Sequence, residues 1–233
     1  MMGVVLLFLL SLWPGGQVDA IDEEVLANVV QKMTRFRFRS DLKGSQVAMA
    51  VLLTQQQCIN GANFEIVVQP ADVNNALIDN SIYLGNRLIV AKPSNNYHAE
   101  YRLLSGGNSS PMQTLIDSAG REAGDCIVFF STNSPCLEKC NGPDGENNGG
   151  DIINLMGNSF NSWNANQKAF VFYSVWDPTI RYPRAKKPTR QEVFLSFKRI
   201  ETQLPLYRCD NNGCYRCVTN PNPMTNTCLY GYY

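Results

Sequence analysis

The chain reads CIVFFSTNSPCLEKC from residue 126 to residue 140. Its first five residues are apolar and rich in β-branched and aromatic side chains, which predicts a strand buried in a sheet. Pro135, Cys136 and Cys140 follow where this strand should end. Because cysteines of exported proteins bind metals or form disulfide bonds, the stretch predicts one of these two sites at the end of a core strand.

Strand and helix patterns alternate on both sides of this stretch. Strands are predicted over residues 47–53, 64–68 and 169–175, with a hairpin or bulged strand over residues 82–91. Helices are predicted over residues 22–38, 97–105 and 189–201, and from residue 152 onward. A rigid, proline-rich loop is predicted over residues 178–188. The alternation predicts one α/β domain over residues 21–201, with a mixed sheet covered by helices.

The composition is that of a folded globular protein. The 233 residues include 20 basic and 20 acidic side chains, and 44% of the residues are hydrophobic. Low, balanced charge argues against a disordered or fibrous chain. A net charge of zero also gives no bulk attraction to polyanions, so nucleic-acid binding would depend on a local basic patch.

Residues 1–20 carry the features of a cleaved signal peptide. The apolar run from Val4 to Trp13 is too short to span a bilayer, and Val18-Asp19-Ala20 predicts cleavage after Ala20. No later apolar stretch is long enough to cross a membrane. We therefore expect a secreted, extracellular protein without a membrane anchor, and the sequence identifies no protein partner.

A second motif precedes the first. The single histidine, His98, stands two residues before Glu100, at the start of a predicted helix. An H-x-E motif followed by P-C-x-x-C is the signature of zinc deaminases, and this sequence fits it with one additional residue between Cys136 and Cys140. Alone, a histidine is usually structural and a secreted cysteine pair is usually disulfide-bonded. Together the motifs predict a catalytic Zn²⁺ held by His98, Cys136 and Cys140, with Glu100 beside the open fourth position.

On these motifs the chain resembles the AID/APOBEC-like zinc-dependent cytidine deaminases, and its leader places it in their secreted branch, the secreted novel AID/APOBEC-like deaminases. The resemblance covers roughly residues 22–200. It implies a cytidine deaminase-like three-layer α/β/α fold with a five-stranded mixed sheet. Asn133 departs from the family pattern, because it stands where S-W-S-P-C has tryptophan.

The resemblance also implies a reaction. Cytosine in single-stranded DNA or RNA would become uracil, with zinc-bound hydroxide attacking C4 and Glu100 acting as general acid and base. Innate defence is the role suggested by family analogy. Two alternatives stay open: deamination of free cytidine or deoxycytidine, and an inactive secreted module that binds nucleic acid.

Several substrate contacts follow from the resemblance. The backbone N–H of Ala99 and the carbonyl of Ser134 would hold the pyrimidine edge, and Asn95 would approach the sugar. Trp176 would stack on the target base, although a core aromatic fits its position equally well. Asp177 would contact the preceding nucleotide, and its alternative is a turn residue before a proline.

A basic cluster lies in the loop after Trp176. Its members are Arg181, Arg184, Lys186 and Lys187, with Tyr182 among them. Basic loops that carry aromatic side chains can follow a phosphate backbone and stack bases. The alternative is a solvated loop stiffened by prolines.

Six cysteines remain outside the predicted metal site, and six cysteines allow about 15 pairings. Cys58 and Cys126 are the two in the domain body, so we expect them to pair. Residues 202–233 form a cysteine-rich tail, in which Cys209, Cys214, Cys217 and Cys228 would form two disulfides or bind a structural zinc. Asn108 begins an N-glycosylation sequon in a predicted loop.

Overall fold

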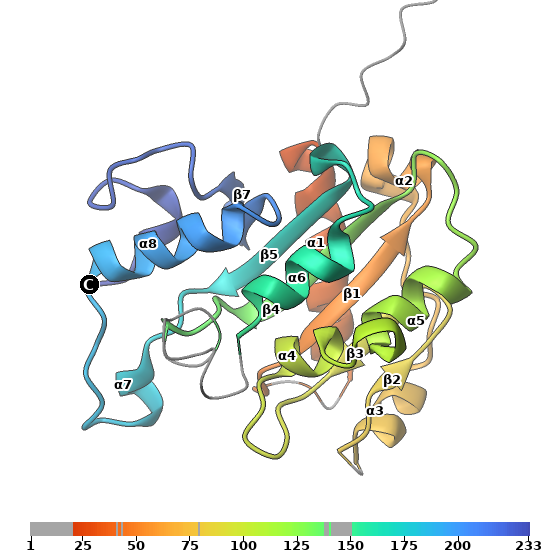
Figure 1. Cartoon of the computed structure of the whole chain (residues 1–233), viewed down its shortest axis with the longest axis horizontal. Helices are drawn as coiled ribbons and strands as arrows, with labels where there is room; N and C mark the ends of the chain where they lie inside the picture. The colour runs from red at the N-terminus through yellow and green to blue at the C-terminus, as the bar shows by residue number, and fades with distance from the viewer. Residues whose placement is uncertain (1–20, 41, 43, 79, 138–139, 141–150) are drawn as a thin grey trace, which may run out of the picture.

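The computed structural model describes residues 21–40, 42, 44–78, 80–137, 140 and 151–233. The predicted signal peptide lies outside these residues. One mixed sheet forms the middle of the domain, and its strand order is β2-β3-β1-β4-β5-β6-β7 (Figure 1). The α/β class predicted from the alternating pattern is confirmed.

Strand direction decides where the loops meet. β1 (Ala48–Leu53) runs antiparallel to both β3 (Leu88–Ala91) and β4 (Cys126–Asn133). β4 and β5 (Lys168–Ser174) are parallel, and so are β5 and β6 (Leu206–Asp210). The carboxyl ends of β3, β4, β5 and β6 therefore lie at one edge of the sheet, which is where α/β proteins commonly place their ligands.

The expected number of five strands is wrong, because the sheet has seven. The additional strands, β2 (Tyr83–Leu84) and β7 (Gly213–Arg216), lie at its two edges, and each is joined to its neighbour by a tight turn. In the first turn, a Cβ on Gly85 would lie 2.8 Å from the Tyr83 ring. In the second, Gly213 has φ +128°, which favours glycine. Residues expected to form a separate tail thus supply β6 and β7.

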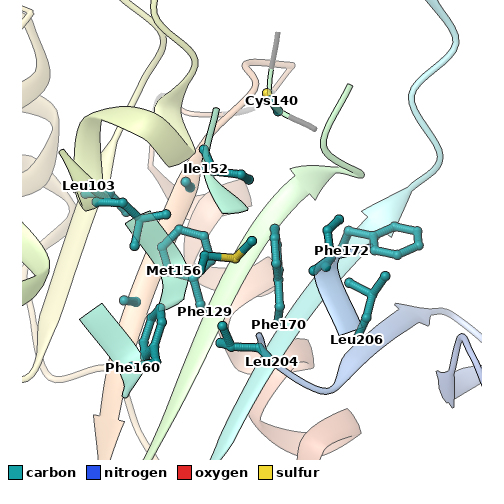
Figure 2. Packing of buried hydrophobic residues seen from close by; sticks show 14 of the residues in the cluster. Leu103, Phe129, Cys140, Ile152, Met156, Phe160, Phe170, Phe172, Leu204 and Leu206 are labelled. Atoms are coloured by element: carbon teal, nitrogen blue, oxygen red, sulfur yellow. The ribbon is translucent and has the colours of Figure 1, made fainter. Parts of the chain in front are cut away.

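Helices cover both faces of the sheet because apolar side chains point from the strands to both sides. α1 (Glu23–Arg39), α2 (Gln55–Asn60) and α3 (Pro70–Ile78) share one core with Met49 and Val51. α4 (Ala99–Leu104), α5 (Pro111–Ser118), α6 (Ile153–Phe160) and α8 (Arg190–Glu201) share the other with Ala50 and Phe129. Figure 2 shows the second core, in which Phe129 packs edge-on against Phe160 and Phe170.

Two local predictions are corrected. Residues 64–68 form no strand, because only Phe64 is buried in the core whereas Val67 is 90% exposed. The predicted loop after β5 contains a short helix, α7 (Pro178–Arg181). By contrast, α8 begins as expected, with Thr189 and Glu192 forming a capping box.

Disulfides tie the domain body and close the tail. Cys58 on α2 pairs with Cys126 on β4, as expected. In the tail, the pairs are Cys209–Cys214 and Cys217–Cys228, so these four cysteines form disulfides and the alternative of a structural zinc is not met. Among the described residues, no helix is both long and apolar enough to cross a membrane.

Candidate active site

The loops that follow three strands converge at the carboxyl edge of the sheet. His98 follows β3, Cys136 and Cys140 follow β4, and Trp176 follows β5. The potential ligand atoms of His98, Cys136 and Cys140 all lie within 4.8 Å of one another. Residues 38 or more positions apart in sequence thus meet because strands β3 and β4 run in the same direction.

The three ligand atoms have the spacing of a tetrahedral metal site. His98 Nδ1 lies 2.9 Å from Cys140 Sγ and 3.7 Å from Cys136 Sγ, and the two sulfurs are 3.6 Å apart. Zinc held at about 2.0–2.1 Å from nitrogen and about 2.3 Å from sulfur places tetrahedral ligand atoms about 3.5–3.8 Å apart. Two distances match and the third is shorter, so this donor set fits a zinc ion with three protein ligands.

The additional residue between the cysteines keeps both thiols on one side of the backbone. The Cys140 N–H donates a hydrogen bond to the Cys136 carbonyl at 3.2 Å, which is the bond of an α-helical turn. Side chains four residues apart in such a turn lie on the same face. The C-x-x-x-C spacing therefore preserves the ligand pair that C-x-x-C provides elsewhere.

Glu100 lies in the first turn of α4, whose N-cap is His98. Its carboxyl group is buried, with the residue 1% exposed. Ser131 Oγ donates a 2.5 Å hydrogen bond to Oε1, and Gln46 Nε2 lies 3.0 Å from both carboxyl oxygens. The side chain is thus held from two sides by residues of β4 and of the segment before β1.

Burial raises the pKa of Glu100 above its ordinary value, although the hydrogen bond from Ser131 and the charge of His98 act in the opposite direction. The hydrogen bond with Cys136, together with burial, raises the pKa of the Cys140 thiol well above its usual range. Cysteine binds zinc as the thiolate, so metal binding at this site should release protons.

The metal ligands and Glu100 open onto a pocket of about 190 Å³. This is several times the roughly 30 Å³ that a water molecule occupies in the liquid. The pocket is lined by Gln46, Pro93, His98, Glu100, Asn133, Ser134, Cys136, Leu137, Trp176, Pro178, Arg181, Tyr182, Ala185 and Pro188. Of the predicted substrate residues, Ser134, Trp176, Arg181 and Tyr182 therefore line it, whereas Ala99 is fully buried beside it.

Other predicted residues lie away from the pocket wall. Asn95 and Asn96, with φ +52° and +67°, form a two-residue turn between Ser94 and Tyr97, which bond to each other through their backbones. Asparagine tolerates this left-handed conformation, so the turn alone accounts for Asn95. Asn108, the predicted glycosylation residue, is exposed in a short 3₁₀ helix, η2 (Gly107–Ser109).

The loop after β5 shows an unexpected ion pair. Asp177 caps α7 through Thr179, and its carboxylate lies 2.6 Å from Lys187 Nζ. Lys187 is thereby engaged within its own loop, whereas Arg184 and Lys186 are exposed. The nucleotide-contacting role expected for Asp177 competes with this pair.

Three residues were not found by sequence reasoning. Gln46 and Ser131 bind Glu100 from 54 and 31 residues away in sequence, and no local motif marks them. Asn133 was noted as a departure from the family pattern, and it proves to line the pocket. Ser134 has an unforeseen second contact, because its Oγ accepts the Trp176 N–H at 2.9 Å and links the metal-binding loop to the opposite wall.

The fold and the site together define a class: an α/β domain with a His/Cys/Cys metal-binding site and a buried glutamate at the carboxyl edge of its sheet. The family model of Secreted Novel AID/APOBEC-like Deaminase 1 matches residues 23–232. The chain belongs to this family, which confirms the resemblance seen in its motifs. No curated protein and no solved structure matches the chain. The family name describes secreted deaminases.

Proposed function

We propose that the protein is a secreted, zinc-dependent deaminase that converts cytosine to uracil in single-stranded DNA or RNA. The observation that supports this most strongly is the position of Glu100 beside the cluster of His98, Cys136 and Cys140, in a pocket. Those three residues would hold zinc, which when bound supplies Lewis-acid activation of water. The family name supports deaminase activity in general.

Glu100 would carry the protons of the reaction. Hydrolytic deamination adds water at C4 and releases ammonia, so one proton must leave the water and protons must reach N3 and the departing amine. A buried carboxyl group with a raised pKa can take up and return such a proton. The hydrogen bonds from Ser131 and Gln46 would hold the carboxylate in one orientation throughout.

The pocket wall supports a base as the reacting group. Trp176 and Tyr182 supply aromatic faces on which a base can stack, and Tyr182 is 56% exposed. The Ala99 N–H and the Ser134 carbonyl would contact the pyrimidine edge. Asn95 on the exposed turn would approach the sugar.

A polynucleotide fits the surface outside the pocket better than a free nucleoside does. Arg181 lines the opening, and Arg184 and Lys186 are exposed beyond it. These cations would contact phosphates that flank the target base, which a nucleoside lacks. Lys187 would join them only on leaving Asp177, whose contact with the preceding nucleotide would also require that separation.

The test uses zinc-loaded protein, with zinc measured by elemental analysis. Cytidine, single-stranded DNA and single-stranded RNA are each incubated with it, and uracil or uridine is quantified. Glu100→Gln should lower the rate at least about 100-fold, the scale of general acid–base catalysis. Glu122→Gln, at an exposed residue distant from the metal-binding cluster, is the matched control. Turnover of cytidine alone would support the nucleoside alternative, and oligonucleotide binding without turnover would support an inactive module.

A further inference from the structure

The pocket has two kinds of wall. Its floor is built from the ends of core strands, whereas much of its rim comes from residues 177–188, here called the rim loop. This loop contributes Pro178, Arg181, Tyr182, Ala185 and Pro188 to the pocket lining. Its position therefore determines the shape of the pocket opening.

Within itself the rim loop is held by few bonds. The ion pair between Asp177 and Lys187 joins its two ends. The Tyr182 N–H bonds to the Pro178 carbonyl, and the Ala185 N–H bonds to the Tyr182 carbonyl, each at 2.8 Å. Most of the loop is exposed to solvent, so these bonds alone leave it weakly anchored.

The C-terminal residues supply an anchor from outside the loop. The Tyr232 hydroxyl donates a 2.8 Å hydrogen bond to the carbonyl of Pro188, the last residue of the rim loop. Lys187 Nζ lies 4.7 Å from the centre of the Tyr232 ring, within the range of a cation–π contact. Burial, followed by the charges of Asp177 and Glu192, raises the pKa of Tyr232 to about 12, so its hydroxyl remains a donor.

Arg190 fastens the same C-terminal residues to the start of α8, directly after the loop. Its guanidinium donates hydrogen bonds to four backbone carbonyls of the tail, those of Pro223, Met224, Leu229 and Tyr232, at 2.6–3.2 Å. Figure 1 shows the C-terminus beside the start of α8. Five bonds from one side chain to carbonyls far along the chain give a rigid junction.

The tail is in turn tied to the core. Cys217 and Cys228 form a disulfide, and both are fully buried in the core that contains Phe172 and Phe197. The Asn226 side chain donates to the carbonyl of Cys217 at 2.7 Å. The contacts of the tail thus run without a break from the core to the rim of the pocket.

We infer that Tyr232 and Arg190 are positioning residues, through which the disulfide-bonded tail holds the rim loop in the shape that admits substrate. Neither residue lines the pocket. The inference rests on the proposed function, since a positioned rim matters when the pocket binds a substrate. Its structural part is testable without turnover.

Tyr232→Phe removes the hydroxyl and keeps the ring. The matched control is Tyr230→Phe, because Tyr230 is 70% exposed and its contact with Arg208 is made by the backbone carbonyl. Hydrogen exchange of the Tyr182 and Ala185 amides should become about fivefold faster in Tyr232→Phe, the factor expected for one net hydrogen bond. Exchange in β4, zinc content and the rates of the Tyr230→Phe control should stay unchanged.

Activity gives a second readout. Tyr232→Phe should raise KM for an oligonucleotide about fivefold while kcat at saturation changes less than twofold. Arg190→Lys, which keeps the charge but cannot make all five bonds, should act in the same direction. Unchanged exchange in the rim loop in both variants would overturn the inference. Faster exchange in a protein that deaminates none of the three substrates would instead uphold the anchor and refute the proposed function.

Discussion

The floor and the rim of the pocket are held by different forces. The floor consists of His98, Glu100, Cys136 and Cys140, placed by the ends of buried strands, and Glu100 and Cys140 have almost no exposed surface. The rim loop is largely exposed and depends on an ion pair, short turns and the C-terminal tail. Chemistry that needs a fixed geometry is thus placed on the rigid part of the domain. Substrate selection is left to a loop whose position can be adjusted.

Removing a metal ligand should have the largest effect. Cys140→Ser replaces a thiolate with a poor zinc ligand in the buried floor, so bound zinc should fall to near zero and deamination should become undetectable. Elemental analysis and uracil release measure the two quantities. Treatment of the wild-type protein with a chelator, followed by added zinc, should remove and restore activity. Full activity of a zinc-free Cys140→Ser protein would contradict the assignment of the floor.

Ser131→Ala should come next, because it removes the shortest contact to Glu100 without touching the ligands. A hydrogen bond to a charged group is worth about 1.5–3 kcal/mol, so kcat should fall about 10- to 100-fold while zinc content is unchanged. Steady-state kinetics on an oligonucleotide provide the test. Ser118→Ala, at a partly exposed serine near the end of α5, serves as control. A change in KM alone would place Ser131 among the substrate contacts.

Trp176→Leu should change binding at the boundary between the floor and the rim. Stacking on an aromatic side chain contributes about 1–3 kcal/mol per base, so KM should rise at least about fivefold. Leucine retains apolar bulk where Trp176 packs against the core, and thermal unfolding checks that the fold persists. Zinc content should not change. An unaffected KM would leave Trp176 as a core residue only.

The smallest effect is expected from the exposed cations of the rim. Arg184→Ala combined with Lys186→Ala should weaken oligonucleotide binding mainly at low salt. The salt dependence of log K should lose roughly 0.7 per phosphate contact for a single strand. Lys198→Ala on the exposed face of α8 is the control. Equal salt dependence in all three proteins would make the cluster an ordinary solvated surface.

Prediction from the sequence succeeded where the signal is local. H-x-E, Pro135 and the spaced cysteines specify ligand chemistry over a few residues, and the capping box of Thr189 and Glu192 specifies a helix start. Residues 64–68 misled because an apolar run satisfies the pattern of a strand even when no neighbouring strand is there to pair with it. The count of five strands failed because short edge strands depend on turns and on pairing partners.

By itself, the sequence determined which residues can bind a metal or carry a proton, because these properties belong to the side chains and to spacings within one turn of a helix. It also indicated which cysteines pair, since their positions divide between body and tail. The tertiary structure decided that Gln46 and Ser131 hold Glu100, that Lys187 bonds to Asp177, and that the tail reaches the rim. These contacts join residues far apart in sequence. They arise only when strand directions and packing bring distant segments to the same edge of the sheet.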